Sequence, residues 1–282
     1  KLLNEFINSL SFKLTPSQEK VTAEIIGDLS KKQSMNRLLQ GDVGSGKTVV
    51  AAISAFITFL NGYQTIIMAP TQILANQHYE TLKKVFEKFK IRMSLITGST
   101  IKKDAGITDV IVGTHALLNK INEFKKVGLI VVDEQHKFGV KQIEFLKKYN
   151  PNRLTMTATP IPRTIAQTLF ADIDLSIIDE LPKNRQKIKT WLVPNEKREK
   201  AYDWIRDQIK QHKSQVFIIC PLVEESESET LKDVKSVKKE FDILKNIFSE
   251  FKLGLLHGKL KEKEKNGVLN NFKQEYLNIL VS

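Results

Sequence analysis

The chain has 282 residues, of which 41% are hydrophobic, so it is long enough to bury one large core or two ordinary ones. No apolar run approaches the roughly 20 residues that cross a bilayer, and no secretion signal stands at the start, which argues against a membrane protein and predicts a cytoplasmic one. The net charge of +12 favours a polyanionic partner such as nucleic acid.

The first signal along the chain is a helix start at residues 15–18. Thr15 is a good helix cap, Pro16 suits the first helical position, and Gln18 stands where a capping box needs it. Taken alone, these residues predict only that a helix begins here.

A phosphate-binding loop follows, because residues 41–48 fit the pattern Gly-x-x-x-x-Gly-Lys-Ser/Thr at every fixed position. Its glycines let backbone amides and the helix N-terminus face phosphates, Lys47 would reach the β and γ phosphates, and Thr48 would hold Mg²⁺. We therefore predict a triphosphatase that uses ATP and Mg²⁺, against the weaker alternative of a glycine-rich turn that happens to carry a lysine. The predicted loop residues are Gly41, Asp42, Val43, Gly44, Ser45, Gly46, Lys47 and Thr48.

Short apolar runs alternate with amphipathic stretches along the whole chain, a pattern typical of parallel β-α units, so the fold is predicted to be α/β. The phosphate-binding loop is expected at the C-terminal edge of the first sheet. The strands expected there are Asn36–Gln40, Thr65–Ala69, Arg92–Ile96, Val110–Val112, Leu129–Val132 and Leu154–Met156, with helices that include Gln72–Lys88 and Lys141–Tyr149.

An acidic box, Asp133-Glu134-Gln135-His136, comes directly after the apolar run 129–132. Asp133 would hold the water shell of Mg²⁺, Glu134 would polarise the water that attacks the γ phosphate, and His136 would report the nucleotide state. By itself such a pair of acids serves equally well as a helix cap. Together with the phosphate-binding loop it indicates an ATPase site.

A threonine- and proline-rich turn occupies residues 157–164 at the end of the next expected strand. The hydroxyls of Thr157 and Thr159 are expected to bond Asp133 or His136, which would couple hydrolysis to movement. The alternative is an ordinary helix start made of threonine and proline.

After residue 182 the composition turns polar, which predicts a linker over residues 183–190 between a domain of residues 1–182 and another of residues 191–282. The second domain is predicted to be incomplete and the chain to be part of a longer polypeptide, with a surface loop over Glu224–Lys239. Cys220, the single cysteine, is predicted to be a small buried hydrophobe. The elements expected there are strand Ile188–Val193, helix Glu196–Gln211, strand Gln215–Cys220, helix Val237–Phe251, strand Leu253–Leu256, helix Glu262–Phe272 and strand Leu277–Val281.

The loop, the acidic box and the Thr-Ala-Thr turn resemble, in this order, motifs I, II and III of superfamily 2 helicases. Within that superfamily, residues 41–52, 112–117, 133–140 and 157–164 resemble the RecG family of branch-migration helicases, and the resemblance covers essentially the whole chain. It implies two tandem RecA-like domains that bind ATP and translocate on duplex DNA, as a monomer, to migrate Holliday junctions and reverse stalled forks in recombination and repair. The alternatives are a transcription-repair coupling translocase and an ATP-gated DNA-binding module with little turnover.

The resemblance also implies roles for individual residues. Gln18 would face the adenine and Phe12 would stack near it. The residues that would couple hydrolysis to movement are Gln135, Thr157, Thr159 and Arg163. The residues that would grip the DNA backbone are Pro70, Thr71, Gln72, Gly98, Ser99, Thr114 and His115, with His257 and Lys259 in the second domain.

Two departures from the family pattern stand out. Motifs V and VI, whose arginines stabilise the transferring phosphate, are absent from these residues, and such arginines are worth on the order of a thousandfold in rate. The fragment alone is therefore expected to bind ATP far better than it hydrolyses it. The segment Gly98–Asp109 also looks shorter than its family counterpart.

Overall fold

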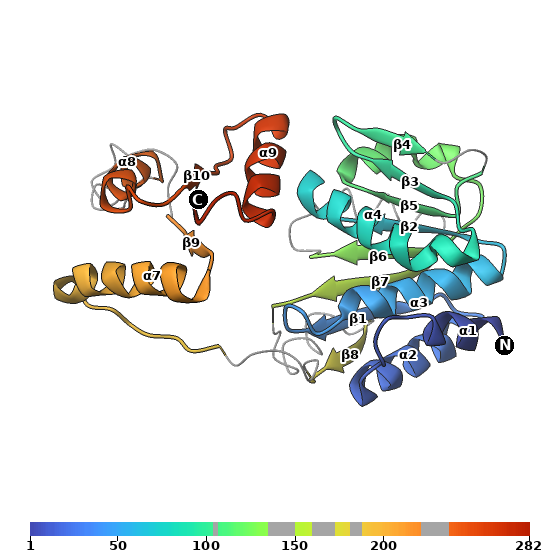
Figure 1. Ribbon diagram of the computed structural model, residues 1–282. Coiled ribbons are helices and arrows are strands. Elements are labelled where there is room, and N and C mark those ends of the chain that lie inside the picture. Colours follow the sequence, from blue (N-terminus) through green and yellow to red (C-terminus); the bar gives the residue numbers. More distant parts are fainter. Residues whose placement is uncertain (104–106, 135–149, 160–172, 181–187, 221–236) are drawn as a thin grey trace. The chain divides into compact units, whose positions relative to one another are not determined.

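The computed structural model describes residues 1–103, 107–134, 150–159, 173–180, 188–220 and 237–282. The chain divides into two compact units, Lys1–Gln186 and Lys187–Ser282, each with its own sheet (Figure 1). The predicted α/β architecture is confirmed. Among the described residues, no helix is both long and apolar enough to span a membrane.

The first unit is built on a sheet with the strand order β4-β3-β5-β2-β6-β7-β1-β8. Among the described strands, all neighbours pair in parallel except β3 and β4, which form an antiparallel pair at one edge. The strands are β1 Asn36–Gly41, β2 Gln64–Met68, β3 Met93–Ile96, β4 Ile101–Lys103, β5 Val110–Gly113, β6 Val127–Asp133, β7 Asn152–Thr157 and β8 Asp174–Ile178.

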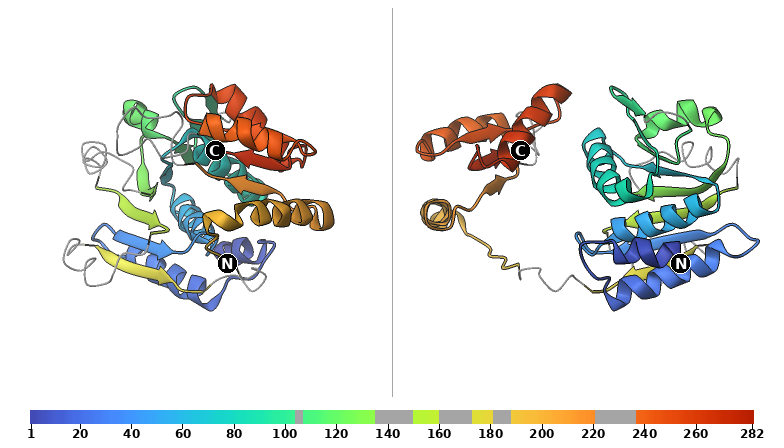
Figure 2. Two further views of the ribbon diagram at one scale, coloured as in Figure 1. Left: turned by 90° about the vertical axis from the view of Figure 1, so that its left-hand side faces the viewer. Right: turned by 45° about the vertical axis from the view of Figure 1, so that its right-hand side comes forward.

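Helices α1 to α4 cover one face of this sheet (Figure 2). The predicted start of the second helix is confirmed, because the Thr15 hydroxyl accepts from Gln18 N and the Gln18 side chain accepts from Thr15 N. The helical elements of the first unit are α1 Leu2–Asn8, α2 Pro16–Leu29, α3 Lys47–Leu60 and α4 Gln72–Phe86, with the 3-10 helices η1 Glu87–Phe89 and η2 His115–Glu123.

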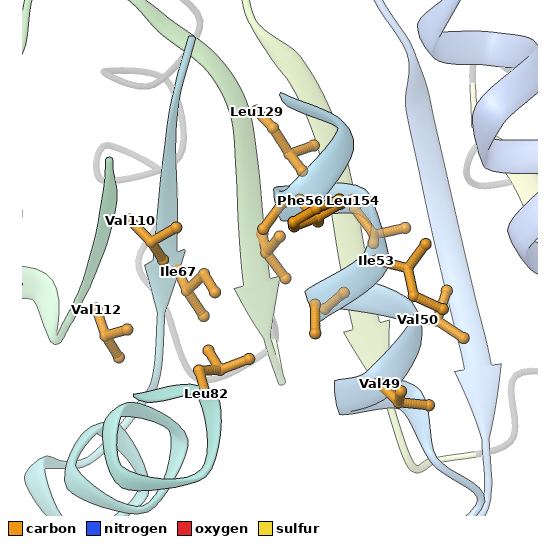
Figure 3. Packing of buried hydrophobic residues seen from close by; sticks show 14 of the residues in the cluster. Val49, Val50, Ile53, Phe56, Ile67, Leu82, Val110, Val112, Leu129 and Leu154 are labelled. Carbon is orange, nitrogen blue, oxygen red and sulfur yellow. The ribbon is translucent and has the colours of Figure 1, made fainter. Parts of the chain in front are cut away.

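The core of the first unit lies between the sheet and helix α3. Side chains of α3, among them Val50, Ile53 and Phe56, pack toward alternate residues of the central strands, such as Leu129 and Leu154 (Figure 3). The intervening residues of the same strands form a second apolar cluster on the other face. Both faces of the central strands are therefore buried, which is the usual situation of strands with continuous apolar runs.

The second unit carries a small parallel sheet with the order β10-β11-β9. Cys220, predicted to be a buried hydrophobe, is only half-buried; it follows β9 and packs against the apolar cluster of this unit. Burial raises the pKa of its thiol, which favours the protonated form. The elements of this unit are η4 Asn195–Lys197, α7 Arg198–His212, β9 Val216–Ile218, α8 Val237–Ile247, β10 Leu253–Leu255, α9 Glu262–Lys273 and β11 Ile279–Val281.

The structure corrects three expectations about the elements. Residues 188–193 do not form the predicted strand and expose their apolar side chains, Leu192 to 98%. Strands β4 and β8 were not predicted. Residues 237–239 belong to α8 rather than to the loop predicted over Glu224–Lys239. The rest of that loop, residues 224–236, and the expected helix 141–149 lie outside the described residues.

Gly113 is needed where strand β5 ends beside β3. A Cβ at this position would lie 2.0 Å from the Ile96 carbonyl oxygen and 2.8 Å from Leu117 Cγ, so the two strands would have to move apart. We expect Gly113→Ala to lower the free energy of unfolding by ~1–3 kcal/mol, the usual cost of overpacking. Urea unfolding measures this loss.

Gly27→Ala is the matched control for that substitution. Gly27 lies on the exposed side of α2, and a Cβ there meets nothing within 4 Å. In a helix the change should stabilise by about 0.5–1 kcal/mol. Equal effects of the two substitutions would contradict the steric explanation.

Candidate functional site

The carboxyl ends of the parallel strands bring the predicted site residues to one edge of the first sheet. Strands β1, β6 and β7 end at Gly41, Asp133 and Thr157, where the predicted ATP residues lie. Strands β2, β3 and β5 end just before the residues predicted to contact DNA. Because the strand order is β3-β5-β2-β6-β7-β1, the two groups of residues occupy adjoining halves of the same edge.

The phosphate-binding loop joins the end of β1 to the start of α3, as predicted. Gly44 and Gly46 have φ angles of 79° and 91°, a left-handed conformation that glycine adopts without strain. Lys47 Nζ donates to the carbonyl oxygens of Gly41 at 2.7 Å and of Asp42 at 3.0 Å. The lysine thus lies along its own loop and its charge is satisfied by backbone oxygens.

The loop lysine and the acidic box share one electrostatic environment. Burial lowers the pKa of the Lys47 ammonium below its ordinary value, and the charges of Asp133, Glu134 and Asp42 oppose that shift only in part. The two acids of the box therefore lie close enough to the lysine to act on its charge. Loop and box meet at this edge of the sheet.

Asp133 is buried and hydrogen-bonded to a histidine that the sequence interpretation missed. His78 Nε2 lies 2.9 Å from Asp133 Oδ2, and each residue is only 9% exposed. His78 belongs to the buried face of α4, which also presents Ala75, Tyr79 and Leu82 to the core. A histidine at this helical spacing within an apolar stripe was the available signal, because a buried polar ring requires a partner.

Glu134 is held by the end of strand β7. Its backbone has a φ of 51°, its Oε1 accepts from Ala158 N at 3.0 Å, and its Oε2 accepts from Thr157 Oγ1 at 3.2 Å. Thr157 and Thr159 hydroxyls lie 2.8 Å apart. These threonines were expected to bond Asp133 or His136. The structure instead gives Thr157 the partner Glu134, whereas Asp133 bonds His78 on α4. The alternative partner, His136, lies outside the described residues.

Three predicted residues, Gln135, His136 and Arg163, lie outside the described residues. Their roles in catalysis and in coupling stay predictions.

Gln18 is packed against the phosphate-binding loop. It is 2% exposed, its Nε2 donates to Ser45 O at 2.8 Å, and a Cβ on Gly46 would lie 2.2 Å from the same nitrogen. Gln18 therefore supports the loop directly. Phe12, predicted to stack near the base, is 51% exposed.

The residues predicted to bind Mg²⁺ offer suitable ligands. Thr48 supplies a hydroxyl and Asp133 a carboxylate, both hard oxygen donors of the kind that Mg²⁺ prefers. Within the described ranges, no group of three or more His, Cys, Asp or Glu residues could hold a metal ion. A single carboxylate completed by phosphate oxygens and water is the arrangement that suits Mg²⁺ rather than a metal held by the protein alone.

The residues predicted to contact DNA lie on the other half of this sheet edge. Thr71 Oγ1 caps α4 by accepting from Leu74 N at 3.3 Å, and Ser99 Oγ donates to Gln72 Oε1 at 3.2 Å. Thr71, Gly98, Ser99 and His115 are exposed, Pro70 and Gln72 are half-buried, and Thr114 is only 3% exposed. Hydroxyls and the N-terminus of a helix, exposed together, are suited to phosphate contacts.

In the second unit, His257 and Lys259 lie in the turn between β10 and α9. His257 O accepts from Leu260 N at 3.2 Å, and the His257 Nδ1 atom is buried without a hydrogen-bond partner in the described part of the chain. Lys259 is exposed.

Comparison with known proteins gives concordant matches. The DEAD/DEAH box helicase family model matches residues 15–168. The chain is 44% identical to the ATP-dependent DNA helicase RecG of Thermotoga maritima over 294 residues, covering 100% of this chain and 37% of the relative. It is 44% identical to RecG of Bacillus subtilis over 292 residues, covering 99% of this chain and 42% of the relative. The chain thus spans 37% to 42% of the length of these relatives.

Solved structures show the same fold. A structure of RecG bound to a three-way DNA junction superposes with a TM-score of 0.77 and 38% identity, covering 100% of this chain and 37% of that one. S. cerevisiae Dbp5 bound to RNA and ADP BeF3 matches with a TM-score of 0.67 and 20% identity, covering 99% of this chain and 72% of that one. At 20% identity, the similarity to Dbp5 concerns the fold alone. That fold is the one of RecA-like helicase domains, as predicted.

Proposed function

Because the chain belongs to the DEAD/DEAH box helicase family, we propose that it is the motor portion of a RecG-type DNA helicase, which hydrolyses ATP with Mg²⁺ to move on duplex DNA. The observation that carries this proposal is the meeting of Lys47, Asp133 and Glu134 at one sheet edge. The residues predicted to contact DNA lie on the adjoining strands of the same edge.

The roles at the nucleotide site follow from charge and hydrogen bonding. Lys47 would leave the carbonyl oxygens of its own loop for the β and γ phosphates, while Thr48 and Asp133 would hold Mg²⁺, which when bound neutralises charge on the phosphates. Glu134 would orient the attacking water and accept its proton. Gln18 would support the loop from α2, and the adenine contacts of Gln18 and Phe12 are part of the proposal.

Coupling to movement would pass through strand β7. Thr157 donates to Glu134 and lies against Thr159, so a change at the γ phosphate that moves Glu134 alters a hydrogen bond at the end of this strand. We assign Gln135, His136 and Arg163 to the same function on family resemblance. Residues 1–182 and 191–282 are proposed as the two motor domains, with residues 183–190 as linker.

The proposed substrate is branched DNA with duplex arms. The related RecG structure holds a three-way DNA junction, and the net charge of +12 suits a polyanion. Backbone contacts from Thr71, Ser99 and His115, with His257 and Lys259 of the second unit, would position the motor without reading sequence. Branch migration of Holliday junctions and reversal of stalled forks, by a monomer in the bacterial cytoplasm, complete the proposal.

ATP turnover by the full-length protein tests this function. We expect a three-way junction to stimulate hydrolysis more than a linear duplex of the same length and composition, because a branch-migrating motor is engaged at the branch. Equal stimulation by both would favour a translocase of the transcription-repair type. A full-length protein whose ATP turnover responds to no DNA would refute the helicase proposal.

A further inference from the structure

His78 and Asp133 form a buried polar pair between helix α4 and strand β6. The Nε2 to Oδ2 distance is 2.9 Å, and the His78 and Asp133 side chains are 11% and 12% exposed. A carboxylate only accepts hydrogen bonds, so Nε2 is the donor. The pair is buried, and a buried polar group is costly unless it is hydrogen-bonded.

The helix that carries His78 is firmly fixed. Successive turns of α4 bury Ala75, Tyr79, Leu82 and Phe86 in the main core. The packing of α4 against the sheet therefore fixes the position of the His78 imidazole relative to β6. Such a donor can hold the Asp133 carboxylate in one rotamer.

We propose that His78 is a positioning residue that holds Asp133 in the orientation required to bind Mg²⁺ in the nucleotide complex. One carboxylate oxygen is engaged by His78, so the other is left to face the metal and its water shell. Residues that hydrogen-bond a metal ligand in this way typically contribute 10–100-fold to metal affinity. The inference rests on the proposed function, because it assumes that Asp133 serves a metal.

The test is a titration of the full-length protein with Mn²⁺ in the presence of ATP, followed by electron paramagnetic resonance. We expect His78→Leu, which fills the space but cannot donate, to weaken Mn²⁺ binding about 10–100-fold. His78→Gln places an amide N–H near the position of Nε2 and should bind Mn²⁺ within about threefold of the wild type, since a hydrogen bond to a charged group is retained. Tyr79→Phe, which removes a hydroxyl from the next buried residue of α4, should leave the affinity unchanged.

ATP turnover gives a second measurement. If His78 acts by positioning, His78→Leu raises the Mg²⁺ concentration for half-maximal turnover, whereas the rate at saturating Mg²⁺ returns toward that of the wild type. Loss of rate with no change in Mg²⁺ dependence would overturn the inference. A wild-type protein without Mg²⁺-dependent turnover would instead refute the proposed function, so the two failures are distinguishable.

If His78→Leu does not fold, as judged by thermal unfolding, His78→Gln and His78→Asn decide the question. The shorter Asn side chain cannot reach the position of Nε2. The inference requires Gln to bind Mn²⁺ more tightly than Asn, and equal affinities would overturn it.

Discussion

Replacing Lys47 by alanine is expected to lower ATP turnover more than about a hundredfold, the scale on which loss of one charge-stabilising group acts. The reason is the position of this ammonium at the first turn of α3, with its pKa depressed by burial and with Asp133 and Glu134 within range of its charge. No other group that the structure describes in the loop provides a cation at this place. Binding of a fluorescent ATP analogue and steady-state turnover measure the effect.

The control for this substitution is Lys32→Ala, which removes an exposed lysine before strand β1. It should leave turnover within about twofold, since surface changes of this kind are usually worth under 0.5 kcal/mol. Turnover in Lys47→Ala within tenfold of the wild type would show that the loop is not the phosphate site.

The substitution Glu134→Gln is expected to separate binding from hydrolysis. Glutamine is isosteric and keeps one oxygen to accept from Ala158 N or from the Thr157 hydroxyl. It cannot accept a proton from the attacking water, so turnover should fall about 10²–10⁴-fold, the usual contribution of a general base. ATP affinity should change only a few-fold.

Two measurements on Glu134→Gln decide this, an equilibrium titration with ATP and a single-turnover rate. Glu87→Gln, at the exposed start of η1, is the matched control and should behave as the wild type. Unchanged single-turnover hydrolysis would remove Glu134 as the group that activates water.

The central strands and the phosphate-binding loop were predictable because their signals are local. Continuous apolar runs such as 129–132 occur where a strand is buried on both faces, and a loop motif has fixed spacing. Strand β8 was not predicted because its sequence runs against the usual pattern, with Ser176 buried and Ile177 exposed. Its stability also comes from pairing with β1, which is far away in sequence. Residues 188–193 have the composition of a strand. A strand also needs a second strand to pair with, and the composition of a segment does not predict whether one is present.

The side-chain partners within the site were less predictable than the strands. Adjacent residues at the end of β6 direct their carboxylates in different directions, Asp133 to His78 on α4 and Glu134 to Thr157 on β7. The backbone of Glu134 also turns here, with a left-handed φ of 51°. The spacing of residues within a motif does not predict the φ angle of Glu134. It also does not predict the contact between His78 and Asp133, which are 55 residues apart in sequence.

The hydrogen bonds of Lys47 to its own loop would make the protein itself a competitor of ATP. The carbonyl oxygens of Gly41 and Asp42 already act as an internal ligand for the ammonium, at 2.7 Å and 3.0 Å. The dissociation constant for ATP would then be the intrinsic constant divided by the fraction of molecules whose lysine has released those carbonyls. Under the proposed function, nucleotide affinity would then depend on how readily Lys47 exchanges these carbonyl oxygens for phosphate, as well as on the contacts between the loop and the phosphates.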